Sequence, residues 1–257
     1  MSSYYYSDAG SVVKDNEEAR QLRYHSFFTV LSQIFGIILI ILVGYWCATW
    51  DGGYSWNNYD GGKVKYHYTL MTTGLVFLQG EAILVYRMFR HERKSFLKAL
   101  HGLMHLIVFV LYLTGLIAMI QFKHTANYFN MYSAHSWVGL IVMVTFIVQY
   151  IGGFVNFGFP KTSPEVRAWY LPIHRACGLI IFAVSCAQAL MGFAQEAMEL
   201  QENNYWFHVC YLSMDCHGAG AVLNLIVLFI IFYGASVVYL ATSEKYRRQP
   251  TPDEIDD

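Results

Sequence analysis

Six long apolar runs dominate the sequence, at about residues 26–50, 67–88, 101–121, 135–158, 174–194 and 217–241. A helix needs about 20 apolar residues to cross the hydrocarbon core of a bilayer, and each run is close to that length. Hydrophobic side chains make up 56% of the chain and charged side chains 14%, which is far from the composition of a soluble globular domain. The sequence therefore predicts an all-α integral membrane protein, a bundle of six transmembrane helices embedded in the lipid bilayer.

Basic residues are concentrated in alternate connections between these runs. Fourteen of the 17 lysines and arginines lie before the first run, in or beside the second and fourth connections, or after the last run. Cytoplasmic segments carry such an excess, so both termini are predicted to be cytoplasmic. We expect cytoplasmic tails over residues 1–25 and 243–257 and a membrane domain over residues 26–242. With no plain targeting motif, the membrane is expected to be that of a secretory or endosomal–lysosomal vesicle, or the plasma membrane.

Four histidines stand at the starts of four different apolar runs. His67, His101, His135 and His174 are spaced 34, 34 and 39 residues apart, which is roughly one membrane span plus a loop each time. Because successive spans are antiparallel, His67 and His135 should lie near the outer face, and His101 and His174 near the cytoplasmic face. An imidazole inside a membrane helix is costly, so such residues indicate a functional site.

Paired histidines at one depth point to a redox cofactor. Two imidazoles from facing helices are the geometry of axial ligation of a haem iron, and two such pairs predict two haems stacked across the membrane. Zinc is the competing metal, but it usually takes four close ligands, which opposite leaflets cannot supply together. A proton relay through the histidines and Glu81 is a second alternative, although it does not require depth-matched pairs. A haem-free membrane scaffold is the third.

The five cysteines show no metal-ligand spacing. Cys210 and Cys216 fall in the last non-cytoplasmic connection, where an oxidising compartment could join them in a disulfide. The alternative is two free thiols.

Four stretches resemble the signature segments of the cytochrome b561 family, the ascorbate-dependent di-haem transmembrane oxidoreductases, and in particular its animal vesicle-type members. These stretches are GEAILVYRMFR, LKALHGLMH, NMYSAHSWVGL and LPIHRACG. The resemblance runs from about Tyr66 to Gly192 and contains the four histidines in order. It implies that the second to fifth helices hold two b-type haems. The implied iron ligands are His67 and His135 for the outer haem, and His101 and His174 for the cytoplasmic haem.

The resemblance also implies two substrate sites. The cytoplasmic ascorbate site is similar to Lys94, Lys98 and Arg167 here, with Arg87 close by, and basic side chains suit ascorbate because it is a monoanion at neutral pH. The residues that resemble the site on the other face are Phe122, His124, Asn130, Tyr132 and Trp137. An interfacial aromatic belt is the alternative interpretation of these aromatic residues. The implied acceptor is monodehydroascorbate or ferric iron; a homodimer is expected, and no nucleic-acid partner.

Some positions depart from the family pattern or have no assigned role. Tyr68 stands where many members have proline, and Ala134 replaces the usual leucine before His135. Both lie on the outer side, so they bear on acceptor preference rather than on haem binding. His105 is interpreted as a neighbour of the haem ligand rather than as an axial ligand. Solvated or interfacial positions are expected for His208 and His217.

Overall fold

The computed structural model describes residues 2–50, 53–57, 61–203 and 218–248. Within these residues, six helical segments are long and apolar enough to cross a membrane, and no β-strand occurs. The segments are Ala19–Thr49, Lys63–Met88, Lys94–Thr125, Ala134–Gly158, Pro164–Met198 and Gly220–Thr242. The predicted all-α six-helix membrane bundle is confirmed. Cys210, Cys216, His208 and His217 lie outside the described residues.

Two of the spans contain π-helical turns. The first span belongs to α1 (Ser2–Thr49), and the second consists of α2 (Lys63–Met71), the π-helical η1 (Thr72–Leu78) and α3 (Gln79–Met88). The third is α4 (Lys94–Thr125), and the fourth is α5 (Ala134–Gly153) with the π-helical η2 (Phe154–Gly158). The fifth is α6 (Pro164–Asn203), and the sixth is α8 (Ala219–Thr242), followed by the 3₁₀ turn η3 (Glu244–Tyr246).

Three helices begin earlier than the apolar runs indicate. Helix α4 starts at Lys94 instead of about residue 101, and α6 starts at Pro164 instead of about residue 174. The predicted N-terminal tail continues α1 as helix back to Ser2. An apolar run covers only the part of a helix that crosses the hydrocarbon core, whereas the helix itself extends beyond that core into the membrane interface. His101 and His174 consequently lie about two to three turns inside their helices, not at the starts.

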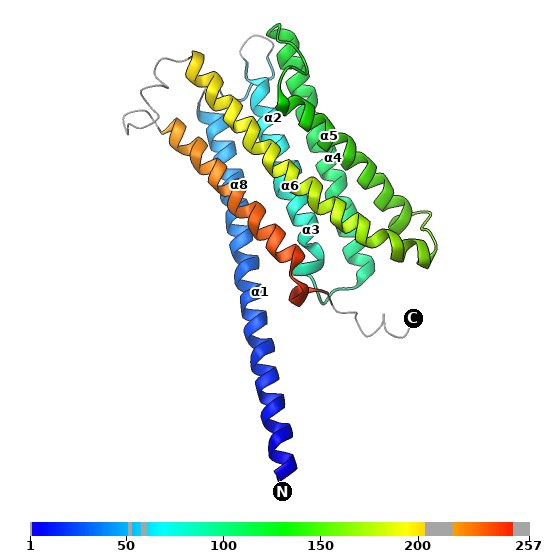
Figure 1. Ribbon diagram of the computed structural model, residues 1–257. Coiled ribbons are helices and arrows are strands. Elements are labelled where there is room, and N and C mark those ends of the chain that lie inside the picture. The colour runs from blue at the N-terminus through cyan, green and yellow to red at the C-terminus, as the bar shows by residue number, and fades with distance from the viewer. Residues whose placement is uncertain (1, 51–52, 58–60, 204–217, 249–257) are drawn as a thin grey trace.

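The helices pack in pairs (Figure 1). Helix α1 lies against α8, α2 against α4, and α5 against α6, whereas α4 and α5 make few contacts with each other. The start of α1 and the turn η3 lie towards the same end of the bundle, as expected for an even number of spans. The pairs α2–α4 and α5–α6 together carry the four histidines, so the fold brings two histidine-bearing pairs face to face.

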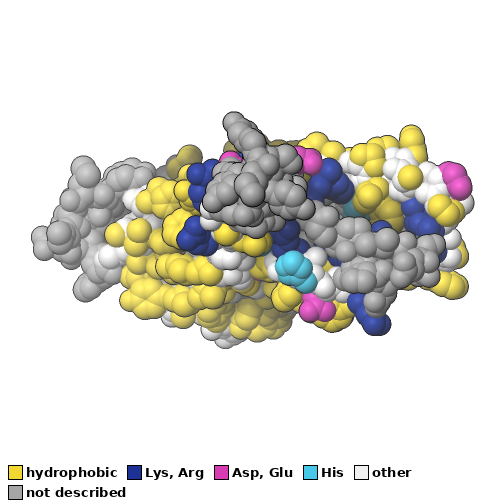
Figure 2. All heavy atoms as spheres, turned by 90° about the horizontal axis from the view of Figure 1, so that it is seen from below, with side chains coloured by type: hydrophobic (Ala, Val, Ile, Leu, Met, Phe, Trp, Pro, Cys, Tyr) yellow, Lys and Arg dark blue, Asp and Glu magenta, His cyan; other side chains and the backbone are white. Residues whose placement is uncertain are grey.

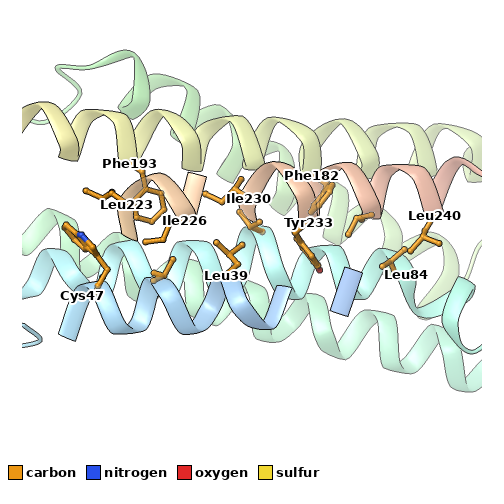
Figure 3. Close-up of a cluster of buried hydrophobic side chains, with 14 of the residues drawn as sticks. Leu39, Cys47, Leu84, Phe182, Phe193, Leu223, Ile226, Ile230, Tyr233 and Leu240 are labelled. Atoms are coloured by element: carbon orange, nitrogen blue, oxygen red, sulfur yellow. The ribbon is translucent and has the colours of Figure 1, made fainter. Parts of the chain in front are cut away.

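A large apolar cluster joins α1 and α8 to the rest of the bundle. It includes Leu39 of α1, Phe182 of α6, and Ile230 and Tyr233 of α8, all fully buried (Figure 3). Lipid is as apolar as these side chains, so the contact stabilises the bundle through close packing rather than through the hydrophobic effect. Helices α1 and α8 therefore form a buttress that packs against α2, α3 and α6.

A buried carboxyl group connects the buttress to α3. Gln33 Nε2 donates to both carboxyl oxygens of Glu81, at 3.0 and 2.9 Å. The Tyr233 hydroxyl lies 2.9 Å from Glu81 Oε1 and 2.8 Å from the Phe77 carbonyl, but it has a single proton to donate. The hydroxyl can therefore donate to only one of these two acceptors at a time. Gln33, Glu81 and Tyr233 together join α1, α3 and α8 through polar contacts inside the membrane.

Candidate functional site

The structure brings the four histidines together in two pairs. The ring centres of His67 and His135 are 6.2 Å apart, and those of His101 and His174 are 6.3 Å apart. These are the pairs that the spacing of the histidines predicts. Each pair combines one histidine from the α2–α4 side with one from the α5–α6 side.

Both separations suit a single metal ion between the rings. Two metal–imidazole bonds of about 2 Å each, together with the distance from each bonded nitrogen to its ring centre, add up to a separation of this size. No group of three or more His, Cys, Asp or Glu side chains within the described residues could hold a metal ion. A metal held by two histidines needs its other ligands from a cofactor, and a haem supplies them. The residues therefore fit haem better than the zinc alternative.

Backbone carbonyls orient one ring of each pair. His67 Nδ1 lies 3.1 Å from the Gly115 carbonyl of α4, and His101 Nδ1 lies 2.7 Å from the Ala82 carbonyl of α3. A proton on Nδ1 that is donated to a carbonyl leaves Nε2 free to bind iron. The two contacts are reciprocal, because each carbonyl belongs to the span that carries the other histidine. Gly115 follows His101 by 14 residues in α4, whereas Ala82 follows His67 by 15 residues in the span of α2, η1 and α3. The π-helical η1 between His67 and Ala82 accommodates the additional residue.

Glycines of the facing helix support the other two rings. A Cβ atom at Gly192 of α6 would lie 2.9 Å from Cε1 of His135, and one at Gly153 of α5 would lie 2.8 Å from Cε1 of His174. Such distances are too short for real Cβ contacts, so each imidazole rests directly against the backbone of its neighbouring helix. Only glycine leaves room for the rings at these two places.

A cavity of about 960 Å³ surrounds the pair His101 and His174. Sites for cofactors and other small molecules are typically about 300–1,000 Å³, so this volume fits a large prosthetic group. The cavity is also lined by the four basic residues predicted for the cytoplasmic substrate site, Lys94, Lys98, Arg167 and Arg87. The structure therefore places a histidine pair and a basic rim in one cavity.

Three further arginines line this cavity, Arg175, Arg247 and Arg248. In the sequence these arginines contributed only to the excess of basic residues that predicts cytoplasmic segments, and no role in a site was predicted for them. Arg175 directly follows His174, which could have indicated its position, whereas no sequence pattern points to a return of the C-terminal segment to the cavity. Arg248 donates to the Glu92 carbonyl at 3.1 and 2.9 Å, which holds this segment against the α3–α4 connection. Figure 2 shows lysine and arginine side chains gathered at this end of the molecule.

The four predicted basic residues do not have equivalent surroundings. Arg87 is buried, and its guanidinium donates to the Ser243 and Ala241 carbonyls at 2.9 and 2.5 Å. It therefore holds the C-terminal end of α8. Arg167 donates to the Thr162 carbonyl at 2.5 Å. Lys94 and Lys98 are one turn apart at the start of α4.

The residues predicted for the other face lie at the end of the bundle that carries His67 and His135. Phe122 and His124 are in the last turns of α4, Asn130 and Tyr132 are in the α4–α5 connection, and Trp137 is in the first turn of α5. Phe122 is half-buried, with its ring centre 6.0 Å from that of Tyr128, and the other four are exposed. Trp137 Nε1 donates to the Met131 carbonyl at 3.1 Å. The geometry gives these residues a common location rather than a shared pocket.

His105 lies beside the inner pair rather than opposite it. Its ring centre is 4.5 Å from that of His101, on the same helix, and 5.6 Å from that of Phe146. Its buried Nδ1 has no hydrogen-bond partner within the described residues. This position is compatible with the predicted role as a neighbour of the ligand.

Fold and site together define an integral, multi-pass membrane protein with two histidine pairs inside its helix bundle. Comparison with known proteins gives the same class. A family model described as eukaryotic cytochrome b561 matches residues 66–200. The chain belongs to the cytochrome b561 family, which confirms the resemblance found in its sequence and makes it an oxidoreductase of a family that carries b-type haem.

Similar proteins extend the match over most of the chain. The "Putative transmembrane ascorbate-dependent reductase CYB561 homolog" of Caenorhabditis elegans is 32% identical over 96% of this chain and 93% of its own length. The "Transmembrane ascorbate-dependent reductase CYB561" of Sus scrofa is 35% identical over 89% of this chain and 86% of its own. The "Plasma membrane ascorbate-dependent reductase CYBRD1" of Xenopus tropicalis is 33% identical over 90% of this chain and 80% of its own length.

Proposed function

We propose that this chain carries electrons from cytoplasmic ascorbate, through two b-type haems, to monodehydroascorbate on the opposite side of the membrane. The observation that carries the proposal is the pair of histidine sites with matched separations of 6.2 and 6.3 Å, one of which shares a cavity with a basic rim. The names of the similar proteins, which describe ascorbate-dependent reductases, support ascorbate as the electron donor.

The four histidines hold the cofactors in this proposal. His67 and His135 bind the outer haem iron, and His101 and His174 bind the cytoplasmic haem iron. Bound haem supplies reversible one-electron chemistry. The chain contributes position and ligand orientation: the Gly115 and Ala82 carbonyls fix two rings, and close-packed glycines seat the other two.

Lys94, Lys98 and Arg167 bind the donor. Their positive charges attract the ascorbate monoanion to the cytoplasmic rim, and their N–H groups donate hydrogen bonds to its enediol oxygens. Ascorbate that loses one electron and one proton becomes monodehydroascorbate. The electron passes inward and the proton is released on the same side. Arg87 supports this rim through its bonds to the end of α8 rather than through contact with ascorbate.

On the outer side, monodehydroascorbate takes up one electron and one proton and becomes ascorbate. Phe122, His124, Asn130, Tyr132 and Trp137 would receive it next to His135. Ferric iron is the alternative acceptor, since the exposed oxygen and nitrogen atoms of Tyr132 and His124 suit a hard cation. Both termini are cytoplasmic in this arrangement, with tails over residues 1–25 and 243–257. The expected homodimer, in a vesicle membrane or the plasma membrane, belongs to the same proposal.

The proposal is tested by the haem-to-protein ratio of the purified chain, with its absorbance spectrum followed as ascorbate is added. Two b-type haems per chain, reduced in two phases, are expected. A protein without haem, or with haem that ascorbate cannot reduce, would return the function to the proton-relay or scaffold alternatives. Vesicles loaded with ascorbate then identify the acceptor, by comparing the rates with external monodehydroascorbate and ferric chelate.

A further inference from the structure

Helices α5 and α6 repeat one pattern of four residues. In α5 this pattern is His135, Gly139, Gln149 and Gly153, and in α6 it is His174, Gly178, Gln188 and Gly192. In both helices the last three residues follow the histidine by 4, 14 and 18 positions. With about 3.6 residues per turn, these intervals bring all four residues to nearly the same face of a helix.

Because the two helices are antiparallel, each glutamine lies against the histidine of the other helix. Gln149 Nε2 donates to the His174 carbonyl at 2.5 Å, and Gln188 Nε2 donates to the His135 carbonyl. Both are bonds between a side-chain amide and the backbone of a histidine in the facing helix. A carbonyl oxygen has two lone pairs, so it can accept such a bond in addition to its own helical bond.

The glycine four residues after each histidine makes room for the amide. A Cβ at Gly139 would lie 2.9 Å from Gln188 Nε2, and one at Gly178 would lie 3.3 Å from Gln149 Nε2. Histidine, glycine and the facing glutamine therefore form one unit, and the bundle contains it twice. We call these units the outer brace (His135, Gly139, Gln188) and the inner brace (His174, Gly178, Gln149).

We propose that Gln149 and Gln188 are positioning residues, each of which fixes the depth and rotation of the histidine on the facing helix. This inference rests on the proposed function, since it assigns the glutamines to the haem-ligand histidines. Each glutamine therefore supports the histidine at the opposite end of the bundle from the histidine of its own helix. Gln149, for example, belongs to the helix of the outer histidine, His135, but supports the cytoplasmic haem. Outer-shell bonds of this kind set the orientation of metal ligands and tune the metal.

The two braces differ in one respect. Gln188 Nε2 also lies 2.9 Å from His135 Nδ1, so its amide touches the imidazole ring as well as the backbone. Nδ1 of His174 is buried and has no hydrogen-bond partner within the described part of the chain. A change of Gln188 should therefore affect its haem more than a change of Gln149 affects the other.

The test uses Gln149→Met and Gln188→Met in the full-length chain. Methionine keeps the length of the side chain and removes the N–H donor. Gln33→Met is the matched control, because Gln33 is a half-buried glutamine of α1 that donates to the Glu81 carboxyl group, at 3.0 and 2.9 Å, and does not line the cavity around His101 and His174. The measurements are the haem-to-protein ratio, the two midpoint potentials, and the electron paramagnetic resonance signals of the ferric haems.

The expected result is a crossed pattern. Gln149→Met shifts the potential and the resonance signal of the haem that ascorbate reduces first, and leaves the other haem as in the wild type. Gln188→Met does the reverse, with the larger shift, and Gln33→Met changes neither haem. Unchanged potentials and signals in both methionine variants, or equal shifts of both haems in each variant, would overturn the inference.

Glycine variants keep the test decisive if a methionine variant does not fold. Gly139→Ala and Gly178→Ala retain both glutamines but displace the amides, so they should shift the outer and the inner haem, respectively. Gly139→Ala should have the larger effect because its Cβ comes closer to the amide. The wild type, measured in the same series, separates the two proposals. A wild type without two haems refutes the proposed function, whereas two haems without the crossed pattern refutes the glutamine braces alone.

Discussion

Lys65 Nζ lies 3.6 Å from Glu196 Oε1, and both side chains are buried, with 0% and 7% of their surfaces exposed. This ion pair connects α2 to α6 two residues before His67. The Tyr68 hydroxyl donates to the other carboxyl oxygen of Glu196, and the Lys65 ammonium lies 4.6 Å from the centre of the Trp46 ring. Tyr68, which departs from the family pattern, thus takes part in a buried polar cluster beside the outer histidine pair.

Removal of one member of this ion pair should destabilise the protein strongly. Lys65→Met and Glu196→Gln each leave one buried charge without the opposite charge of its ion pair, which costs about 3–5 kcal/mol. The double variant should recover most of that loss, as measured by unfolding in detergent micelles. Glu244→Gln breaks the exposed pair between Arg247 and Glu244, at 3.0 Å, and should cost less than about 1 kcal/mol. Additive effects of the two single changes would show that the pair is not coupled.

Alanine at Gly192 or Gly153 should displace a haem ligand. The added Cβ would approach the His135 or His174 ring to within 3 Å, so the imidazole would have to move away from the other histidine of its pair. Gly192→Ala should lower the occupancy of the outer haem and Gly153→Ala that of the inner haem, measured by haem content and absorbance. Gly44→Ala of α1 is the control, since a Cβ there meets nothing within 4 Å. Full occupancy with unshifted spectra in both variants would contradict the expectation.

Loss of individual histidines should separate the two haem sites. His101→Ala or His174→Ala should abolish reduction by ascorbate, whereas His67→Ala or His135→Ala should leave the inner haem reducible and stop transfer across the membrane. Stopped-flow absorbance after addition of ascorbate distinguishes these results.

His105→Ala is the comparison for the inner ligand. It should retain both haems, because the His105 ring lies beside His101 and not opposite His174. A His101→Ala protein with two haems and full activity would reverse the assignment in favour of His105.

Neutral substitutions at the cytoplasmic rim should weaken ascorbate binding. Lys98→Ala and Arg167→Ala should raise the ascorbate concentration for half reduction by about tenfold or more, because one charge-assisted hydrogen bond contributes about 1.5–3 kcal/mol. The effect should diminish as salt screens the remaining charges. Lys123→Ala, near the C-terminal end of α4, is the control and should leave the titration unchanged. An unchanged titration in the rim variants would remove these residues from the site.

Arg87 should affect stability more than ascorbate binding. Arg87→Lys removes the forked pair of bonds to the Ser243 and Ala241 carbonyls, so the end of α8 should be less well held. The expected result is a lower unfolding midpoint with a nearly unchanged ascorbate titration. A change in the titration as large as that of Lys98→Ala would place Arg87 in contact with the substrate.

Much of the architecture could be predicted from the sequence because a bilayer restricts both the length and the direction of each span. The spacing of His67, His101, His135 and His174 was enough to predict which histidines meet, since antiparallel spans return every second histidine to the same depth. That Lys94, Lys98 and Arg167 share one site was implied by the resemblance to the cytochrome b561 family. The helix starts at Lys94 and Pro164 were not predicted, because helices continue beyond the apolar runs into the interface.

The six spans, the membrane class and the pairing of the four histidines follow from the amino-acid sequence. The side chains that support those pairs are seen in the folded bundle alone. The bonds of Gln149 and Gln188, the ion pair of Lys65 and Glu196, and the return of Arg248 to the cavity depend on how each helix is rotated about its axis and which helix lies beside it. In a membrane, the lipid-facing and the packed faces of a helix are both apolar, so hydrophobic periodicity does not specify that rotation. Close packing and a few polar bonds between helices specify it instead.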